Sequence, residues 1–338
     1  MKLAAFALLL IAQLVLKSDS AAQAKQVHHY IYYAGAPENM RNDSLFLTTK
    51  AAEGAQIAYR WRQLEPEKGE YDFSMIRDDL AFLSSKGKKL WIQLQDVTFM
   101  PTLIPVPRYL VRESEYNGGA DKQYRTEGDS DTVAVHEGWA SRRWDPKVQE
   151  RFYKLLDALG KEFDGRITGI NFAESSVGFG SSGRYFPKGY SYDVYRDAII
   201  ANMKALKRAF PKSVTVQYAN FMPGEWRPVE DRGYLRAVYD AAKTLRVGVG
   251  GPDVMPFRPG HVNGAHPLIR DASTVVPVAM AVQDGNFEEK NRETGKVITL
   301  PELMRYATDS LNVDYLFWGT QQPFYSSDVI PFLRSVKH

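Results

Sequence analysis

The chain has 338 residues with a formal net charge of +3, 43 Lys and Arg against 40 Asp and Glu, and no cysteine. The lack of thiols excludes a cysteine nucleophile and thiolate metal sites, and charge spread along the chain gives no case for nucleic acid as a partner. Six Trp and 19 Tyr are many for this length. Exported proteins often stack surplus aromatic rings on sugars, although packing accounts for most such rings in any fold.

Residues 1–24 have the pattern of an export signal. Lys2 supplies the positive start, an apolar run follows from Leu3 to Leu16, and Ala22-Gln23-Ala24 fits the small-x-small cleavage rule. No later segment reaches about 18 consecutive apolar residues. We therefore expect a secreted or periplasmic protein that begins near Lys25 and does not insert into a membrane once the signal is removed.

Strand-like and helix-like segments alternate through the rest of the chain. Strands are expected at 30–34, 56–61, 89–94, 167–172, 214–218, 247–250, 275–282 and 315–318. Helices are expected at 74–87, 146–163, 191–210, 234–245, 266–272, from 300 onward and at 327–336.

Capping signals mark several of these helices. Ser74 is placed to cap the first one, and Asp145-Pro146 combines a cap with a proline at the first helical position. Thr299 and Glu302 form a capping box around Pro301. The helix boundaries are therefore better defined than the hydrophobic pattern alone would make them.

Residues 95–145, between the third strand and the next helix, form the longest irregular region, rich in proline, glycine and mixed charge. Loops of this length inside a compact domain are typical of lids or cleft walls, with disorder as the alternative.

Eight strands separated by helices or long crossovers predict an α/β protein in which residues 25–338 form a single (β/α)₈ TIM barrel. An open doubly wound sheet is the alternative, but no glycine-rich nucleotide fingerprint follows an early strand. We accordingly expect no cofactor.

Polar residues gather just after the carboxyl ends of the strands, where a barrel forms its active-site mouth. The candidates are Arg60, Gln93, Asp96, Asn171, Glu174, Asn220, Glu225, Asp253, Gln283, Asp284 and Trp318. Acids and amides bind hydroxyl groups and an indole supports an apolar ring face, so the set favours a carbohydrate. No histidine pair has the spacing of a metal site. Glu174, read alone, could equally be a solvated loop acid.

One stretch resembles a known family. Tyr59 to Phe73, YRWRQLEPEKGEYDF, is similar to the second-strand segment of clan A glycoside hydrolases, in their β-galactosidase-like and β-xylosidase-like branches. The resemblance implies that Glu174, after the fourth strand, is the general acid/base and that Arg60 orients the nucleophile. It also implies that Trp318 floors the sugar subsite.

Two departures from that family pattern affect the chemistry. Asn171 and Glu174 are three residues apart, which puts them on opposite faces of an ideal strand unless the chain bulges or turns. Gln283 stands where the family has its nucleophilic glutamate. Asp284 is then a shifted nucleophile, or Asp253 acts as a base on water, or the second carboxylate is lost.

We favour an exported glycoside hydrolase that cleaves O-glycosidic bonds of an oligo- or polysaccharide with Glu174 as proton donor. The alternative is a non-catalytic polysaccharide-binding or assembly protein on a degenerate barrel, and a lyase that uses Glu174 as base is a third possibility. The sequence makes no prediction of the sugar, the linkage or the oligomeric state.

Overall fold

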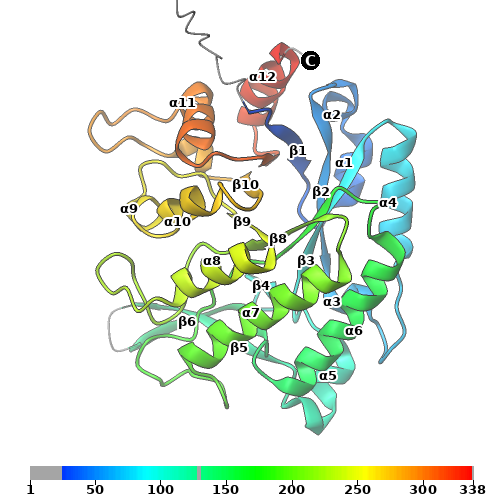
Figure 1. Ribbon diagram of the computed structural model, residues 1–338, viewed down its shortest axis with the longest axis vertical. Coiled ribbons are helices and arrows are strands. Elements are labelled where there is room, and N and C mark those ends of the chain that lie inside the picture. Colours follow the sequence, from blue (N-terminus) through cyan, green and yellow to red (C-terminus); the bar gives the residue numbers. More distant parts are fainter. Residues whose placement is uncertain (1–24, 128–130, 337–338) are drawn as a thin grey trace, which may run out of the picture.

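The computed structural model describes residues 25–127 and 131–336; the predicted signal, 1–24, lies outside the described residues. Eight parallel strands close into a barrel in the order β1-β11-β10-β9-β8-β7-β3-β2 (Figure 1). They are β1 (His28–Tyr32), β2 (Ala52–Arg60), β3 (Lys89–Gln95), β7 (Gly169–Phe172), β8 (Val214–Tyr218), β9 (Gly248–Gly251), β10 (Val278–Val282) and β11 (Tyr315–Trp318). This confirms the predicted (β/α)₈ TIM barrel.

Helices cover the outside of the barrel between successive strands (Figure 1). They are α1 (Pro37–Asn42), α2 (Ser44–Thr48), α3 (Trp61–Leu64), α4 (Ser74–Ser85), α6 (Pro146–Phe163), α7 (Tyr192–Ala209), α8 (Tyr234–Leu245), α9 (Pro259–Val262), α10 (Ala265–Ala272), α11 (Leu300–Arg305) and α12 (Ile330–Ser335), with shorter turns η2 (Asn286–Glu288), η3 (Tyr306–Ser310) and η4 (Tyr325–Val329). The long helices α6, α7 and α8 each bury an apolar face toward the barrel.

The predicted caps are confirmed at two helices and wrong at a third. The carboxylate of Asp145 accepts hydrogen bonds from the first backbone N–H groups of α6, and Thr299 and Glu302 form their capping box at α11. Ser74 does not cap α4. Its backbone N–H is instead accepted by Asp72, two residues earlier, at 2.9 Å.

The interior of the barrel is filled by aromatic rings at its amino-terminal end. Tyr30, Trp91 and Phe317 are fully buried there, and the centroids of the Trp91 and Phe317 rings lie 4.9 Å apart. Gly169 makes room for them, because a Cβ at that position would lie 2.7 Å from the Trp91 ring. The amino-terminal end of the barrel interior is therefore filled by side chains, and only the carboxyl-terminal end can form a cleft.

The region 95–145 is more regular than its composition predicted. It contains β4 (Val97–Thr98), α5 (Arg108–Arg112), η1 (Ser114–Tyr116), β5 (Ala120–Glu127) and β6 (Val133–Ser141). The strands form an antiparallel sheet in the order β4-β6-β5. The strand β5 is largely polar, so it lacks the apolar pattern that marks a strand in sequence.

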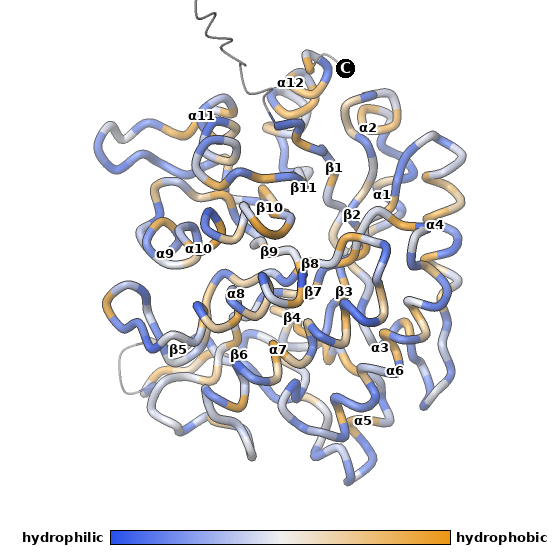
Figure 2. The backbone as a smooth tube through the Cα atoms, in the orientation of Figure 1, coloured by the Kyte–Doolittle hydropathy of each residue, from blue (hydrophilic) through white to orange (hydrophobic). Residues whose placement is uncertain are grey.

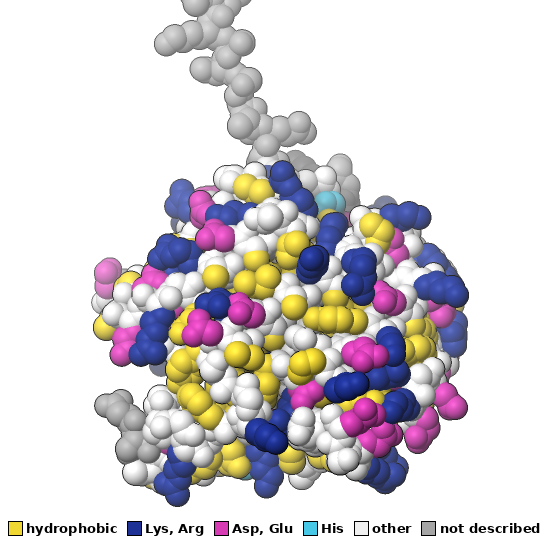
Figure 3. Space-filling model, turned by 60° about the horizontal axis from the view of Figure 1, so that its bottom comes forward, with side chains coloured by type: hydrophobic (Ala, Val, Ile, Leu, Met, Phe, Trp, Pro, Cys, Tyr) yellow, Lys and Arg dark blue, Asp and Glu magenta, His cyan; other side chains and the backbone are white. Residues whose placement is uncertain are grey.

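The surface is hydrophilic in its outer loops and carries charges of both signs. Hydrophilic residues dominate the outer loops, for example the one between η2 and α11 (Figure 2), and acidic and basic side chains are interspersed over the face shown in Figure 3. Within the two described ranges, no helix is both long and apolar enough to cross a membrane.

Candidate active site

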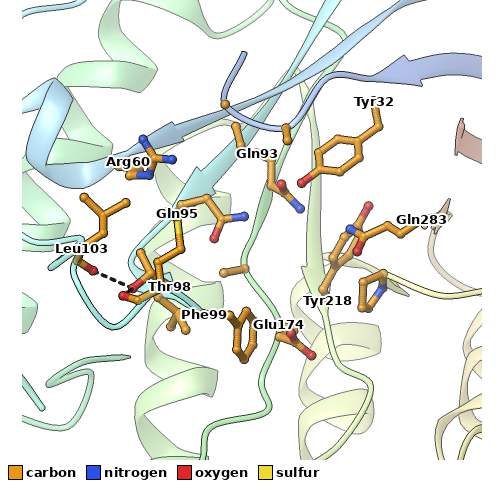
Figure 4. Close-up of a pocket in the computed structure, with 17 residues that line it drawn as sticks. Tyr32, Arg60, Gln93, Gln95, Thr98, Phe99, Leu103, Glu174, Tyr218 and Gln283 are labelled. Atoms are coloured by element: carbon orange, nitrogen blue, oxygen red, sulfur yellow. Dashed lines mark hydrogen bonds between the residues drawn. The ribbon is translucent and has the colours of Figure 1, made fainter. Parts of the chain in front are cut away.

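A cleft of about 210 Å³ opens at the carboxyl ends of the barrel strands. The predicted residues Arg60, Gln93, Glu174 and Gln283, which come from four different strand ends, all lie in its wall (Figure 4). The other lining residues are Tyr32, Ala34, Gly35, Ala58, Gln95, Val97, Thr98, Phe99, Met100, Leu103, Ala173, Tyr218 and Pro252. The segment from Val97 to Leu103 forms one wall, as expected for a cleft-forming loop.

The backbone around Glu174 is fixed on both sides although β7 ends at Phe172. The N–H of Ala173 donates to Leu94 of β3 at 3.2 Å, and the N–H of Ser175 donates to Tyr218 of β8 at 3.0 Å. Ala173 and Glu174 both line the cleft, although adjacent residues of a regular strand face opposite ways. The backbone therefore leaves regular strand geometry at Ala173 and Glu174, and Glu174 reaches the cleft whereas Asn171 does not.

The carboxyl group of Glu174 lies in an environment that favours its protonated form. Burial raises its pKa to about 7, the negative charge of Asp253 adds to the rise, and a hydrogen bond from Asn220 together with the positive charge of Arg143 opposes it. The amide of Asn220 donates to Oε2 of Glu174. A carboxyl group of this kind is partly protonated near neutral pH and can give its proton to a leaving group.

The two candidates for the second carboxylate follow the neighbouring strands β9 and β10, and neither lines the cleft. Asp253 is half-buried, follows β9, and accepts a hydrogen bond from Nδ2 of Asn286 at 2.8 Å. Its charge acts on Glu174. Asp284 is exposed and its charge acts on Tyr32, whose pKa is raised to about 12 mainly by burial, with Arg60 opposing.

Asp96 and Asn171 are buried and do not line the cleft. Asp96 is 3% exposed and bound by Arg143 at 2.7 and 2.8 Å and by Ser141 at 2.5 Å. Asn171 is fully buried inside the barrel, where its Oδ1 accepts from Trp91 and Gln56, both at 2.9 Å. Their polar groups hold strands together, so a substrate-binding role for these two is not supported.

Glu225 and Trp318 also lie away from the cleft. The carboxylate of Glu225 accepts backbone N–H groups of Arg232, Tyr234 and Leu235, and so fixes the start of α8. Trp318 is fully buried, and its indole N–H donates to His29 on the outside of the barrel at 3.2 Å. It cannot floor a sugar subsite, because alternation along β11 turns Phe317 inward and Trp318 outward.

The sequence reasoning missed several residues that line the cleft. Tyr32 and Tyr218 end β1 and β8 on the inward face, and Phe99 and Met100 are 55% and 51% exposed at the rim. The two tyrosines could have been found by applying strand alternation to every strand, since each lies two residues beyond another inward-facing residue. Phe99 and Met100 carry no local signal, because their position depends on how the loop folds back.

No three His, Asp or Glu side chains in residues 25–127 and 131–336 are grouped to hold a metal ion. The arrangement in the cleft is one of carboxyl, amide, phenol and guanidinium groups. These groups can bind hydroxyls and transfer protons.

Comparison with solved structures finds the same barrel in other proteins. A β-galactosidase from Bacillus circulans sp. alkalophilus matches with a TM-score of 0.53 at 12% identity, over 87% of this chain and 50% of its own. A β-galactosidase from the Antarctic haloarchaeon Halorubrum lacusprofundi gives 0.53 at 13% identity, over 86% and 52%. A GH5_18 protein from Bifidobacterium longum subsp. longum in complex with Manb1-4GlcNAc gives 0.51 at 11% identity, over 87% and 68%.

The chain spans about half the length of the two β-galactosidases that it matches. No protein-family model matches the chain, and no curated protein matches it in sequence. At these identities the likeness shows the barrel fold, so the chemistry has to be argued from the cleft itself.

Proposed function

We propose that this protein is an exported glycoside hydrolase that cleaves O-glycosidic bonds of an oligo- or polysaccharide. The observation that carries the proposal is the half-buried Glu174, whose pKa is raised to about 7 by burial, in the wall of an open cleft. Its proton would go to the glycosidic oxygen as the bond to the anomeric carbon breaks. The similarity of YRWRQLEPEKGEYDF to clan A glycoside hydrolases supports the same reading. The predicted export signal in residues 1–24 would bring the enzyme to polysaccharide outside the cell.

The test of this function is the release of new reducing ends from a panel of plant, microbial and animal glycans. Wild-type protein and the Glu174→Gln variant are assayed side by side at pH 5–7. Release by the wild type and not by the variant supports the proposal. A product with an unsaturated sugar end would instead identify a lyase.

The hydrogen bond from Asn220 gives a prediction about pH dependence. It stabilises the ionised form of Glu174 and so lowers its pKa. In Asn220→Ala that stabilisation is lost, the pKa of Glu174 rises, and the protonated form persists to higher pH. The basic limb of the kcat/KM profile should therefore move to higher pH, measured over pH 4–10. An unchanged limb would show that Glu174 does not set it.

We assign the second carboxylate to Asp253, because its charge acts directly on Glu174 and its Oδ1 is held by Asn286. Asp253→Asn should lower kcat by about 100-fold or more, the size expected for loss of a general base, whereas Asp284→Asn should stay within about tenfold. The two substitutions each remove one negative charge after neighbouring strands, so each controls for the other. A larger loss of kcat in Asp284→Asn than in Asp253→Asn would assign the role to Asp284.

A second candidate function rests on Gln283. It lines the cleft at the position where clan A enzymes carry their nucleophile, and an amide cannot attack an anomeric carbon. The protein would then bind polysaccharide without cutting it. Calorimetry with the same glycan panel separates the two functions: binding without turnover supports this one, and measurable turnover rejects it.

A further inference from the structure

Three arginines beside the cleft share one hollow. Arg62 of α3 and Arg108 and Arg112 of α5 line it together with Ile104 and Val111. Within the part of the chain that the structure describes, no carboxylate forms an ion pair with any of the three. Their guanidinium groups also donate no hydrogen bond to these residues. Some other arginines do form ion pairs, as Arg143 does with Asp96 and Arg142 with Asp121.

The three positive charges are close enough to act on one another. Partial burial, followed by the charges of Arg108 and Arg112, lowers the pKa of Arg62. Bringing like charges together is unfavourable unless an anion joins them. An anion bound in the hollow would therefore relieve the repulsion between the three positive charges.

Residues that line the hollow are close neighbours in the chain of residues that line the cleft, in two separate segments. Leu103 lines the cleft and Ile104 lines the hollow, while on β2 and α3 the cleft residue Arg60 is followed two positions later by Arg62. The backbone N–H of Arg62 donates to Pro105 at 2.8 Å, which ties the two segments together. A glycan chain lying in the cleft could thus extend one of its residues into the hollow.

We propose that the hollow of Arg62, Arg108 and Arg112 binds an anionic substituent, a carboxylate or a sulfate, on the glycan that occupies the cleft. Guanidinium groups present paired N–H donors that match the oxygen atoms of both anions. The inference deepens the proposed function, on which it rests for the glycan, and names acidic polysaccharides as the substrate class.

The experiment measures binding, and so does not depend on turnover. Oligosaccharides from pectin, alginate and hyaluronan are titrated calorimetrically beside their carboxyl-reduced neutral counterparts, and sulfated dextran beside dextran, all with the Glu174→Gln variant to prevent cleavage. We expect at least one charged glycan to bind about tenfold or more tightly than its neutral partner, the size of one charge-assisted contact. The carboxylate and sulfate pairs identify which anion is preferred.

The arginines are tested by R62Q/R108Q/R112Q in the same background, with R108Q/R112Q as a second variant confined to exposed side chains of α5 that should not affect folding. Both should lose the preference for the charged glycan and keep the affinity for the neutral one. Arg305→Gln, on α11 far from α5 (Figure 1), is the matched control for loss of a surface charge.

Equal binding of every charged and neutral pair, or a triple variant that keeps the preference, would overturn the inference while leaving hydrolysis untouched. Charge-selective binding that needs the three arginines, in a protein whose wild type releases no reducing ends, would support the inference and reject the proposed hydrolase. The two proposals therefore fail in distinguishable ways.

Discussion

Glu174→Gln is expected to lower the hydrolysis of natural glycans by about 10²–10⁴-fold, the usual contribution of a general acid. Gln has nearly the same shape and can still contact Asn220, but it has no proton to give to a leaving oxygen. The loss should appear in kcat, measured as reducing ends released at pH 6. The variant should keep its fold, since Glu174 makes no ion pair within the described residues.

The leaving group makes this prediction sharper. The 4-nitrophenolate group of a 4-nitrophenyl glycoside leaves without needing a proton donor. The variant should therefore retain much more of its activity on that substrate than on a glycan. Glu70→Gln, an exposed glutamate in the loop after α3, is the matched control and should behave as the wild type. A variant that loses activity equally on both substrates would argue for a structural role of Glu174.

Asp96→Ala should destabilise the protein by about 3–5 kcal/mol, the usual effect of removing one partner of a buried ion pair. Arg143 would remain buried without the two hydrogen bonds, at 2.7 and 2.8 Å, that it now donates to Asp96. Although burial opposes ionisation, Arg143 holds the pKa of Asp96 below its ordinary value, so the pair is charged at neutral pH. Urea unfolding followed by circular dichroism measures the change.

The same substitution should also reduce activity, because Arg143 donates to the backbone oxygen of Glu174 at 3.1 Å. Asp157→Ala is the matched control, since Asp157 pairs with Arg208 at 2.9 Å on the exposed surface. Exposed pairs contribute about 0–1 kcal/mol. If Asp96→Ala were no more destabilising than Asp157→Ala, the buried pair would not be what holds the backbone at Glu174.

The motif that carried the family resemblance is mainly structural in this protein. Glu65, its central acid, is fully buried and accepts hydrogen bonds from Arg151, from the Tyr109 hydroxyl at 3.0 Å and from the Trp61 indole at 2.8 Å. It also accepts the backbone N–H of Gly69 at 3.0 Å. Of the motif, only Arg60 reaches the cleft, which explains why the stretch indicates the fold better than the chemistry.

The local pattern by itself determined the alternation of strands and helices, whereas closure of the sheet is a tertiary property, since an open doubly wound sheet fits the same pattern. Eight short apolar segments, separated by amphipathic segments with caps such as Asp145 and Thr299, are sufficient for the alternation because strand and helix periodicity are properties of neighbouring residues. It also determined that Arg60, Gln93, Glu174 and Gln283 would meet, since parallel strands of a barrel end on one rim.

Only the tertiary structure decided which polar residues near that rim face the cleft. Asp96 and Glu225 follow strand ends as Glu174 does, but a distant arginine and a helix start take up their carboxylates. Trp318 faces out of the barrel because it comes one residue after the inward-facing Phe317. The bend that brings Glu174 inward depends on hydrogen bonds to β3 and β8, which lie about 80 and 45 residues away in sequence, and contacts at that range leave no local pattern to read.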